Sequence, residues 1–387
     1  MELWHCCSVS CCPDIAIWFI RNSGYLVKFH RMFRFFLLLV LLLPLFSACT
    51  PVPVTPLPLV PTTTAALESA APIDVFFSDP DAPGAQKYRG GPDENLAQAI
   101  RSAEFSVDAA FYDLNLWSIR DALIAARKSG IQVRIVAETD HLDEAEFQDL
   151  LNAGIKIIDD RRDSLMHNKF VVIDGTDVWT GSMNFTTAGA YRNDNNLLHI
   201  RSRQLAENYT TEFNEMFIQK MFGDDIIAGT PNPVFTLDGT QIENYFSPDD
   251  GAADAIIAAL QTAEESISFL AFSFTSDPIA DILLQQAAEG VEIAGVFERR
   301  QYESNTGGEF DRLAAAGLDV RLDGNRYSMH HKVFIIDGQT VITGSYNFSR
   351  SAEQRNDENV LIIHNPAIAA LYLVEFNRIF ALASPSR

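Results

Sequence analysis

Two segments of the chain carry the same set of reactive side chains, 163 residues apart. Each has a histidine, a lysine and an aspartate in the spacing H-x-K-x4-D, followed by G-S-x-N. The residues are His167, Lys169, Asp174, Ser182 and Asn184 in the first segment and His330, Lys332, Asp337, Ser345 and Asn347 in the second. An imidazole can act as a nucleophile or as an acid and base, and ammonium and amide groups can hold anionic oxygens. Each segment therefore has the groups needed to bind an anion and to react with it.

The local pattern predicts a β-hairpin that positions these groups. Alternate side chains of a strand share a face, so His167 and Lys169 point the same way. Asp174 is an odd number of residues from His167 and precedes a glycine between two apolar runs. We therefore expect its carboxylate to hydrogen-bond loop backbone in a turn. Ser182 and Asn184 share a face of the returning strand, so the hairpin gathers imidazole, ammonium, hydroxyl and carboxamide on one patch.

The similarity between the two halves extends upstream of the hairpins. Each half contains an apolar strand, a helix ended by a glycine, a second buried strand and a second helix. The expected strands are residues 107–112, 133–137, 267–272 and 293–297, and the expected first helices are residues 119–128 and 279–289. This alternation indicates an α/β fold. We predict two tandem repeats, residues 73–225 and 240–383, each a mixed, mostly parallel sheet flanked by helices, related by a pseudo-twofold axis.

The doubled motif resembles that of the phospholipase D superfamily, whose members carry H-x-K-x4-D twice. The resemblance covers residues 73–380 and implies that the two motif patches meet in one site between the repeats. It implies that His167 attacks phosphorus to form a phosphohistidine and that His330 is general acid and then base, with the reverse assignment left open. The resemblance also implies a set of phosphate donors, Lys169, Lys332, Asn184 and Asn347, and counts Asp174 and Asp337 with the catalytic residues. No metal and no cofactor is expected.

The repeats differ 28 residues after the motif histidine. Glu358 stands there in the second repeat and Asn195 in the first, where the family often has an acidic residue. Family members commonly cross these orienting groups between the halves, which would pair Glu358 with His167 and Asn195 with His330. A carboxylate fixes the imidazole tautomer and stabilises its cationic form, which suits the nucleophile. With Ser182 and Ser345, these two residues complete the expected phosphate-binding and orienting set.

Composition limits the class of protein. Of 387 residues, 47% are hydrophobic and 21% are charged, which indicates a globular protein and excludes a disordered or fibrous one. The formal charge of −22 argues against broad electrostatic capture of nucleic acid. All five cysteines lie in the first 49 residues, so the rest of the chain folds without disulfides or thiolate ligands.

The N-terminal region has the pattern of an exported protein. We expect residues 1–48 to be a leader and signal peptide, with Met32 as a more ordinary start, because a basic flank precedes a short apolar run. The order F-S-A-C resembles a bacterial lipobox, which would make Cys49 a lipidated residue. Residues 49–72 are rich in Pro and Thr and are expected to form a linker. The expected location is the cell envelope, with a membrane anchor at Cys49.

Three functions fit these patterns. Hydrolysis of phospholipid head groups is the first, because the protein is expected to be exported beside lipid and lacks basic character. An exported endonuclease of the same superfamily is the second, and a surface lipoprotein without catalysis is the third. Transfer of the head group to an added alcohol stays open. Because both motifs lie in one chain, a complete site does not require an oligomer. Arg192 and Arg355, in matching positions, either bind phosphate or brace the repeat interface.

Overall fold

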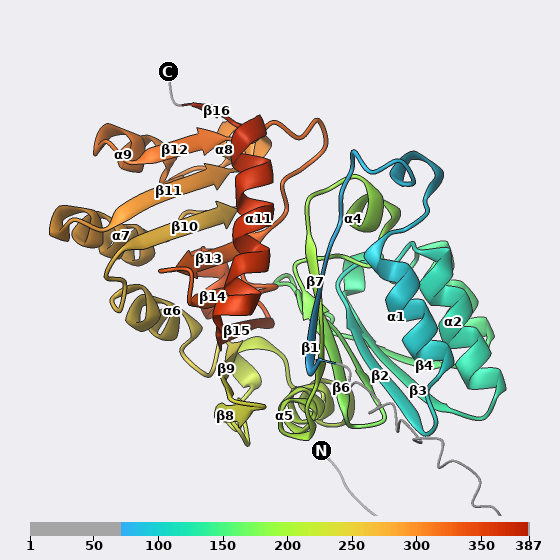
Figure 1. Cartoon of the computed structure of the whole chain (residues 1–387). Coiled ribbons are helices and arrows are strands. Elements are labelled where there is room, and N and C mark those ends of the chain that lie inside the picture. Colours follow the sequence, from blue (N-terminus) through green and yellow to red (C-terminus); the bar gives the residue numbers. More distant parts are fainter. Residues whose placement is uncertain (1–70, 386–387) are drawn as a thin grey trace, which may run out of the picture. The chain divides into compact units, whose positions relative to one another are not determined.

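The computed structural model describes residues 71–385, which belong to one compact unit (Figure 1). The expected leader, the expected lipidation site Cys49 and residues 49–70 of the expected linker lie outside the described residues. Two β-sheets with flanking helices make up the described chain. Within residues 71–385, no helix is long and apolar enough to cross a membrane.

Among the described residues, the first sheet has seven strands in the order β1-β7-β6-β5-β2-β3-β4. They are β1 (Ile73–Phe77), β2 (Ser106–Phe111), β3 (Gln132–Ala137), β4 (Lys156–Asp159), β5 (Lys169–Ile173), β6 (Asp177–Gly181) and β7 (Asn196–Arg201). Strands β5 and β6 form the predicted hairpin, and Asp174 and Gly175 at its turn both have positive φ. Those two residues therefore suit the turn that closes the hairpin.

In the part of the chain that the structure describes, the second sheet has nine strands in the order β16-β12-β11-β10-β13-β14-β15-β9-β8. They are β8 (Val234–Leu237), β9 (Thr240–Ser247), β10 (Ser266–Ala271), β11 (Glu292–Phe297), β12 (Asp319–Leu322), β13 (Lys332–Ile336), β14 (Thr340–Gly344), β15 (Glu358–His364) and β16 (Ser384–Pro385). Strands β9 to β15 repeat the arrangement of β1 to β7, with β9 beside β15 as β1 is beside β7.

Helices follow the same duplication. Those of the first repeat are α1 (Pro92–Arg101), α2 (Trp117–Lys128), α3 (Ala145–Asn152), α4 (Thr187–Tyr191) and α5 (Arg203–Asn214). Those of the second are α6 (Ala252–Leu260), α7 (Asp277–Glu289), α8 (Arg299–Ser304), α9 (Phe310–Ala315), α10 (Arg350–Gln354) and α11 (Pro366–Leu382). Single-turn 3-10 segments lie at Ala85–Lys87 (η1), Thr139–His141 (η2) and Gly223–Asp225 (η4), and a π-helical segment (η3, Glu215–Gln219) follows α5.

The prediction of an α/β fold with two mixed sheets is confirmed, but the sheets are not mostly parallel. Strand β3 pairs in parallel with β2 and β4, and β11 pairs in parallel with β10 and β12. The other neighbours pair antiparallel. The strand–helix–strand segment of each repeat was read correctly. The motif hairpin and the strands that extend the sheet beyond it contribute the antiparallel majority.

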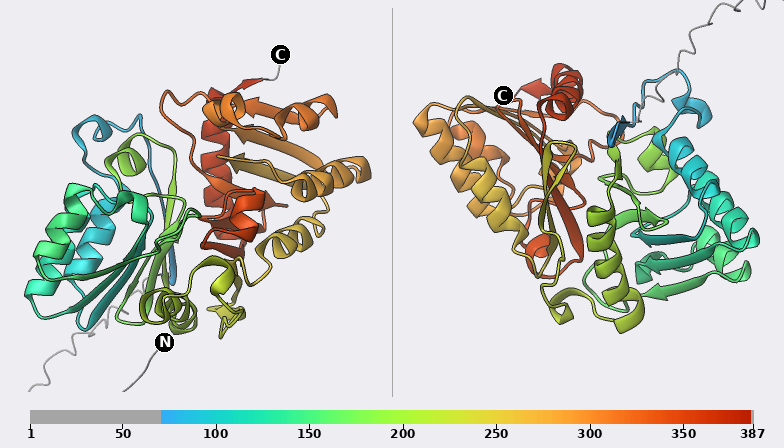
Figure 2. Two further views of the ribbon diagram at one scale, coloured as in Figure 1. Left: turned by 180° about the vertical axis from the view of Figure 1, so that it is seen from behind. Right: turned by 60° about the horizontal axis from the view of Figure 1, so that its bottom comes forward.

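Helices α5 and α11 lie on the inner faces of the sheets, and α1, α2, α6 and α7 lie on the outer faces (Figure 2). The inner apolar residues form one core shared by the two repeats. Within it, the ring of Tyr209 on α5 packs edge-on against Phe246 of β9, and Tyr372 on α11 packs likewise against Phe77 of β1. Each inner helix therefore contacts the opposite repeat, and this crossed packing holds the two motif hairpins in register.

Candidate active site

The backbone at each motif histidine is fastened to the opposite repeat. The N–H of His167 donates to the carbonyl of Asp357 at 3.0 Å, and the N–H of His330 donates to the carbonyl of Asp194 at 2.8 Å. Return hydrogen bonds from the N–H groups of the two aspartates complete a short parallel bridge on each side. The structure thus brings the two motifs together between the repeats.

His167 is paired with the buried carboxylate of Glu358. Its Nδ1 lies 2.7 Å from Oε2 of Glu358, and Oγ of Ser345 donates to the same oxygen at 2.7 Å. Burial lowers the pKa of His167 to about 4, against the opposing effect of the carboxylate. Burial also acts to raise the pKa of Glu358, but His167 and Lys169 outweigh it and the pKa lies below its ordinary value. At neutral pH the pair is a neutral imidazole beside an ionised carboxylate, which places the hydrogen on Nδ1 and the free lone pair on Nε2.

His330 is paired with an amide instead. Its Nδ1 lies 2.9 Å from Oδ1 of Asn195 and 3.1 Å from the carbonyl oxygen of Ser182. Oγ of Ser182 donates to Asn195 Oδ1 at 3.0 Å. Because both partners of Nδ1 are acceptors, Nδ1 carries the hydrogen and Nε2 has the lone pair. The crossed pairing predicted from the sequence is therefore present, with Glu358 on His167 and Asn195 on His330.

The motif lysines are buried beside the histidines. Nζ of Lys169 donates to the carbonyl of His167 at 2.6 Å, and Nζ of Lys332 lies 3.3 Å from His330 Nε2. Burial lowers the pKa of Lys169 to about 7 and that of Lys332 well below the lysine value, and the Lys169 ammonium depresses the latter further. The motif pair thus assembles four basic side chains around the carboxylate of Glu358, with Asp113, Glu138 and Glu298 farther out. A bound phosphodiester anion would supply the missing negative charge.

Gly181 and Gly344 end β6 and β14, so the serines and asparagines of the two G-S-x-N segments lie just beyond the returning strands. The expectation that Ser182 and Asn184 share a face of the returning strand is therefore wrong. Oδ1 of Asn184 and Oδ1 of Asn347 are buried and have no hydrogen-bond partner among the described residues. As placed, each Oδ1 can only accept a hydrogen bond; to donate to a phosphate oxygen, the amide must be flipped so that Nδ2 takes this position. Gly181 and Gly344 have φ of 148° and 151°, and a Cβ at either position would collide with the backbone of the next strand. These glycines are needed for the close approach that brings the asparagines to the site.

The two motif aspartates lie in the hairpin turns, where their carboxylates bind backbone. Asp174 accepts hydrogen bonds at 2.7–2.8 Å from the N–H groups of residues 104, 105 and 106, just before and at the start of β2. Asp337 accepts at 2.7–2.9 Å from the N–H groups of residues 264, 265 and 266. The backbone role expected from the spacing is observed, and the structure does not bring these carboxylates to the histidines. Asp174 and Asp337 therefore serve to fasten each motif hairpin to the neighbouring strand.

Sequence reasoning missed a buried layer behind the histidines. Asn168 and His331 stand between the histidine and lysine of each motif and face away from the site. Asn168 donates to Oε1 of Glu212 at 3.2 Å, and Nε2 of His331 lies 3.2 Å from Oε1 of Glu375. The two glutamates, on α5 and α11, are also 163 residues apart. The repeat offset was the signal that could have identified them as anchors of the motif strands.

Each histidine also contacts an aromatic ring. The ring of Tyr112 packs edge-on against His167 with centroids 4.8 Å apart, and Phe272 packs likewise against His330 at 4.4 Å. The motif lysine nitrogens lie 4.8 and 4.6 Å from the centres of these same rings. The two aromatic residues are related by the upstream offset of 160. They restrict the rotamers of the histidines and lysines and differ by one hydroxyl.

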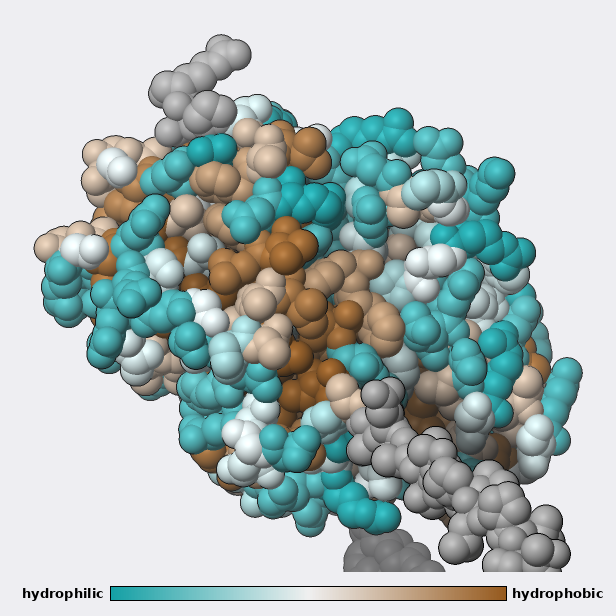
Figure 3. Space-filling model, in the orientation of Figure 1, coloured by the Kyte–Doolittle hydropathy of each residue, from teal (hydrophilic) through white to brown (hydrophobic). Residues whose placement is uncertain are grey.

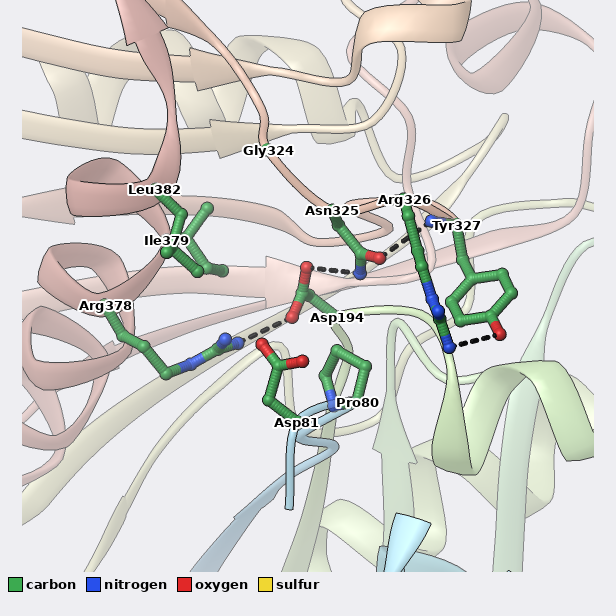
Figure 4. A pocket seen from close by; sticks show the side chains of 10 residues that line it. All are labelled: Pro80, Asp81, Asp194, Gly324, Asn325, Arg326, Tyr327, Arg378, Ile379 and Leu382. Carbon is green, nitrogen blue, oxygen red and sulfur yellow. Dashed lines mark hydrogen bonds and ion pairs between the residues drawn. The ribbon is translucent and has the colours of Figure 1, made fainter. Parts of the chain in front are cut away.

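A cavity of about 150 Å³ adjoins the segment that carries Asn195 (Figure 4). Across it, Nη2 of Arg378 donates to Oδ1 of Asp194 at 2.6 Å, and Nδ2 of Asn325 donates to Oδ2 at 2.7 Å. Both carboxylate oxygens of Asp194 are therefore engaged. These bonds fix the segment that presents Asn195 to His330.

Metal-ligand side chains lie beside the site rather than in it. Within residues 71–385, Asp113, His141 and Glu144 form a group whose ligand atoms could hold a metal ion. None of the three was singled out from the sequence, because they follow two different strands.

The comparisons with known proteins agree with this geometry. A family described as "Cardiolipin synthase, PLD-like domain" matches residues 96–217 and 256–380, one match in each repeat. Mitochondrial cardiolipin hydrolase of Chlamydomonas reinhardtii is 31% identical over 121 residues, covering 31% of this chain and 54% of that protein. Phospholipase D of Rickettsia typhi is 34% identical over 155 residues, covering 36% of this chain and 74% of that protein. The chain thus spans about half the length of the algal relative.

A solved structure shows the same fold across both repeats. Phosphatidylserine synthase of Haemophilus influenzae Rd KW20 matches 82% of this chain and 88% of its own, with a TM-score of 0.63 at 13% identity. The family match on each repeat and the two assembled motifs lead to one conclusion: the chain belongs to the phospholipase D superfamily, as a member with two PLD-like domains in tandem.

Proposed function

We propose that this protein hydrolyses the phosphodiester bond of phospholipid head groups through a phosphohistidine on His167. The observation that carries the proposal is the unequal pairing of the two histidines, with a carboxylate on His167 and an amide on His330. The names of the relatives, a phospholipase D and a cardiolipin hydrolase, point to the same class of substrate.

The pairing assigns the two roles. When Nε2 of His167 attacks phosphorus, positive charge develops on the ring, and the Glu358 carboxylate stabilises it through Nδ1–H. The partner of His330 at Nδ1 is the neutral amide of Asn195, which stabilises an imidazolium less than a carboxylate does. Protonated His330 can therefore release its other proton, from Nε2. In the bound complex the substrate anion favours protonated His330, whose Nε2–H can then be given to the leaving oxygen.

The steps balance without a metal or a cofactor. Attack by His167 forms the N–P bond as the P–O bond to the head-group alcohol breaks, and His330 gives its proton to that oxygen. Neutral His330 then takes a proton from water, and the oxygen of that water attacks phosphorus and releases His167. Lys169 and Lys332 stay beside the phosphoryl oxygens throughout and stabilise their charge. An alcohol in place of water would yield head-group exchange.

An apolar helix face supports lipid as the substrate. Leu371, Val374 and Leu382 on α11 are 46%, 71% and 56% exposed. In Figure 3 apolar surface runs across the face of the molecule on which α11 lies in Figure 1. The face also contains Arg378, which is partly exposed and paired with Asp194 and Glu375. A largely apolar face allows a strongly acidic protein to rest on a membrane that its net charge would otherwise avoid.

A nuclease is the second candidate, and one cluster favours it. The guanidinium of Arg192 lies 5.7 Å from the ring centre of Tyr88 and 5.6 Å from that of Tyr327, and Arg326 lies 4.7 Å from Tyr327. Tyr327 lies three residues before His330 in the chain. Arginines interleaved with tyrosines suit a single strand, whose phosphates bind cations and whose bases stack on rings.

We also propose that the protein is exported and anchored to a membrane through a lipid on Cys49. This rests on the order F-S-A-C after a short apolar run, in a part of the chain outside the described residues. Mass spectrometry of the membrane fraction would test it, since lipidation adds the mass of acyl chains to a mature N-terminal cysteine.

The activity is tested with the full chain on vesicles of cardiolipin, phosphatidylglycerol or phosphatidylethanolamine, and separately on single-stranded DNA, with a chelator present. We expect release of the head group by the wild type and none by His167→Ala, with His364→Ala as a matched control on a histidine at the end of β15. A Leu371→Glu/Val374→Glu variant should lose activity on vesicles and keep it on a soluble diester. Cleavage of DNA alone would instead establish the nuclease, and inactivity on both substrates would overturn the proposal.

A further inference from the structure

Three side chains with metal-ligand chemistry converge where two parallel strands end. Asp113 lies two residues after β2, and His141 and Glu144 lie on the segment that follows β3, in and just after η2. Strands β2 and β3 pair in parallel, so their carboxyl ends lie at the same edge of the first sheet. This edge is where open α/β sheets bind ligands.

The ligand atoms are close enough for one small cation. One nitrogen or oxygen from each of the three residues lies within 4.8 Å of the others, and His141 Nδ1 is 2.8 Å from Glu144 Oε1. Around an ion with metal–ligand distances of about 2.1 Å, neighbouring ligand atoms are about 3.0 to 3.4 Å apart. The group therefore needs only a small contraction to coordinate an ion.

Two oxygens of the group have nothing to bind. Oδ1 of Asp113 and Oε2 of Glu144 are both buried, and neither has a hydrogen-bond partner in the described part of the chain. Two carboxylates held together in this way need either a shared proton or a cation between them.

The fold does not require this cluster. At the positions that match by strand ends, the second repeat has Ser273, Gln301 and Ser304. There Oγ of Ser273 accepts a hydrogen bond at 3.0 Å from Nδ2 of Asn305, and the same architecture is built without a carboxylate pair. The acidic group is thus specific to the repeat that carries His167.

The cluster is connected to the active site through one side chain. The ring of Tyr112 packs edge-on against His141 with centroids 4.9 Å apart and against His167 at 4.8 Å. Nζ of Lys169 lies 4.8 Å from the centre of the same ring. An ion that fixes His141 would therefore fix the ring that supports the nucleophile.

We propose that Asp113, His141 and Glu144 bind one divalent transition-metal ion, of the Zn²⁺ or Mn²⁺ type, beside the phosphohistidine site. An imidazole with two carboxylates suits these ions better than Mg²⁺, which favours oxygen ligands and keeps its waters. Three protein ligands leave at least one position of the ion open to water or to an anionic oxygen. The ion joins the loops after β2 and β3 and takes no part in the transfer of the phosphoryl group.

Binding is measured at equilibrium on the full chain, without an activity assay. The metal-free protein is titrated with Zn²⁺, Mn²⁺ or Mg²⁺, and bound metal is counted by mass spectrometry after dialysis. We expect one equivalent of Zn²⁺ or Mn²⁺ and a higher melting temperature, and weak or no binding of Mg²⁺. Asp113→Asn and Glu144→Gln should weaken binding by at least about tenfold, as loss of a metal-site group does. Asp143→Asn, an exposed acidic residue next to the group, is the matched control and should bind as the wild type does.

A contrary result would be equally clear. If the carboxylates share a proton, Zn²⁺ and Mn²⁺ will not bind above the level of Asp113→Asn, and that variant will be at least as stable as the wild type without metal. This outcome would overturn the metal site. His167→Ala, which abolishes the proposed hydrolysis, should keep full metal binding, so failure of the metal site and failure of the proposed function are distinguishable.

Discussion

Replacing Glu358 by Gln tests the assignment of the nucleophile most directly. Glutamine keeps the size of the buried side chain and can still bond to Ser345, but it removes the negative charge 2.7 Å from His167 Nδ1. The pair becomes a buried ion pair only as positive charge develops on His167 in the transition state, and removing one partner of such a pair costs about 3 to 5 kcal/mol. We use the lower part of this range, about 3 to 4 kcal/mol, because the glutamine retains part of the hydrogen bonding. At about 1.4 kcal/mol for each tenfold change in rate, attack by His167 should slow about 100- to 1,000-fold.

Two substrates separate attack from protonation of the leaving group. A p-nitrophenyl diester has a leaving group that needs no acid, whereas a phospholipid has a poor one that does. Glu358→Gln should therefore slow the single-turnover rate on both substrates. Asn195→Ala, which frees the ring of His330, should slow the reaction of the phospholipid and leave the nitrophenyl diester within about threefold of the wild type.

The control for folding is Glu353→Gln, which also replaces a carboxylate by an amide. Glu353 lies five residues before Glu358 in the chain and accepts hydrogen bonds from Tyr346 Oη and from the N–H of residue 253, away from both histidines. It should react at the wild-type rate. If Glu358→Gln slowed only the phospholipid reaction, the roles of the two histidines would have to be exchanged. A rate within about threefold of the wild type on both substrates would refute the argument that the carboxylate stabilises the attacking imidazole.

Three further predictions follow from buried charges. Asp174→Asn should lower the free energy of unfolding by about 2 kcal/mol in urea titrations, because it weakens three charged hydrogen bonds to the backbone. Two of these bonds are exposed, which keeps the loss modest. The kcat of the folded fraction should stay unchanged. The pKa of His167 is about 4 in the folded protein and near 6.5 in the unfolded chain. Between these pH values only the unfolded chain takes up this proton, so the free energy of unfolding falls as the pH falls from 6.5 to 4. His167→Gln should remove at most about 3 kcal/mol of this change, measured by unfolding at pH 7 and pH 4. Lys332→Met should raise the melting temperature without ligand, because burial and the neighbouring Lys169 disfavour the cationic form of Lys332. Vanadate, used as a mimic of the phosphoryl group, should raise the melting temperature of the wild type and not that of the variant.

The duplication explains how much of the site could be predicted from the sequence. Residues that recur at one offset must occupy equivalent positions, so the motif histidines, lysines and asparagines were identified together, and the one mismatch between Asn195 and Glu358 indicated the crossed pairing. The turn role of Asp174 followed from strand alternation alone. These inferences use local geometry, which a sequence encodes directly.

The contacts between repeats were not accessible in this way. The bonds of Asn168 to Glu212 and of His331 to Glu375 depend on α5 and α11 packing on the inner faces of the sheets. The periodicity of α5 and α11 marks which face of each helix is buried, but it does not state which sheet that face will cover. The antiparallel majority of the sheets was missed for a similar reason, since strand partners depend on the whole sheet.

Three of the positions at which the two repeats differ lie around the histidines, and these three differences have the same sense. His167 is surrounded by Glu358 and Tyr112, with Asp113 next along the chain, whereas the matching positions around His330 are Asn195, Phe272 and Ser273. The ionisable groups are therefore on one side and neutral groups on the other. The symmetric residues, two lysines and two asparagines, suit a phosphoryl group, whose oxygens are themselves nearly equivalent. The asymmetric residues suit a reaction in which one histidine must accumulate positive charge and the other must give up a proton. A duplicated fold with this one-sided substitution pattern can thus bind a diester symmetrically and still attack it from one direction.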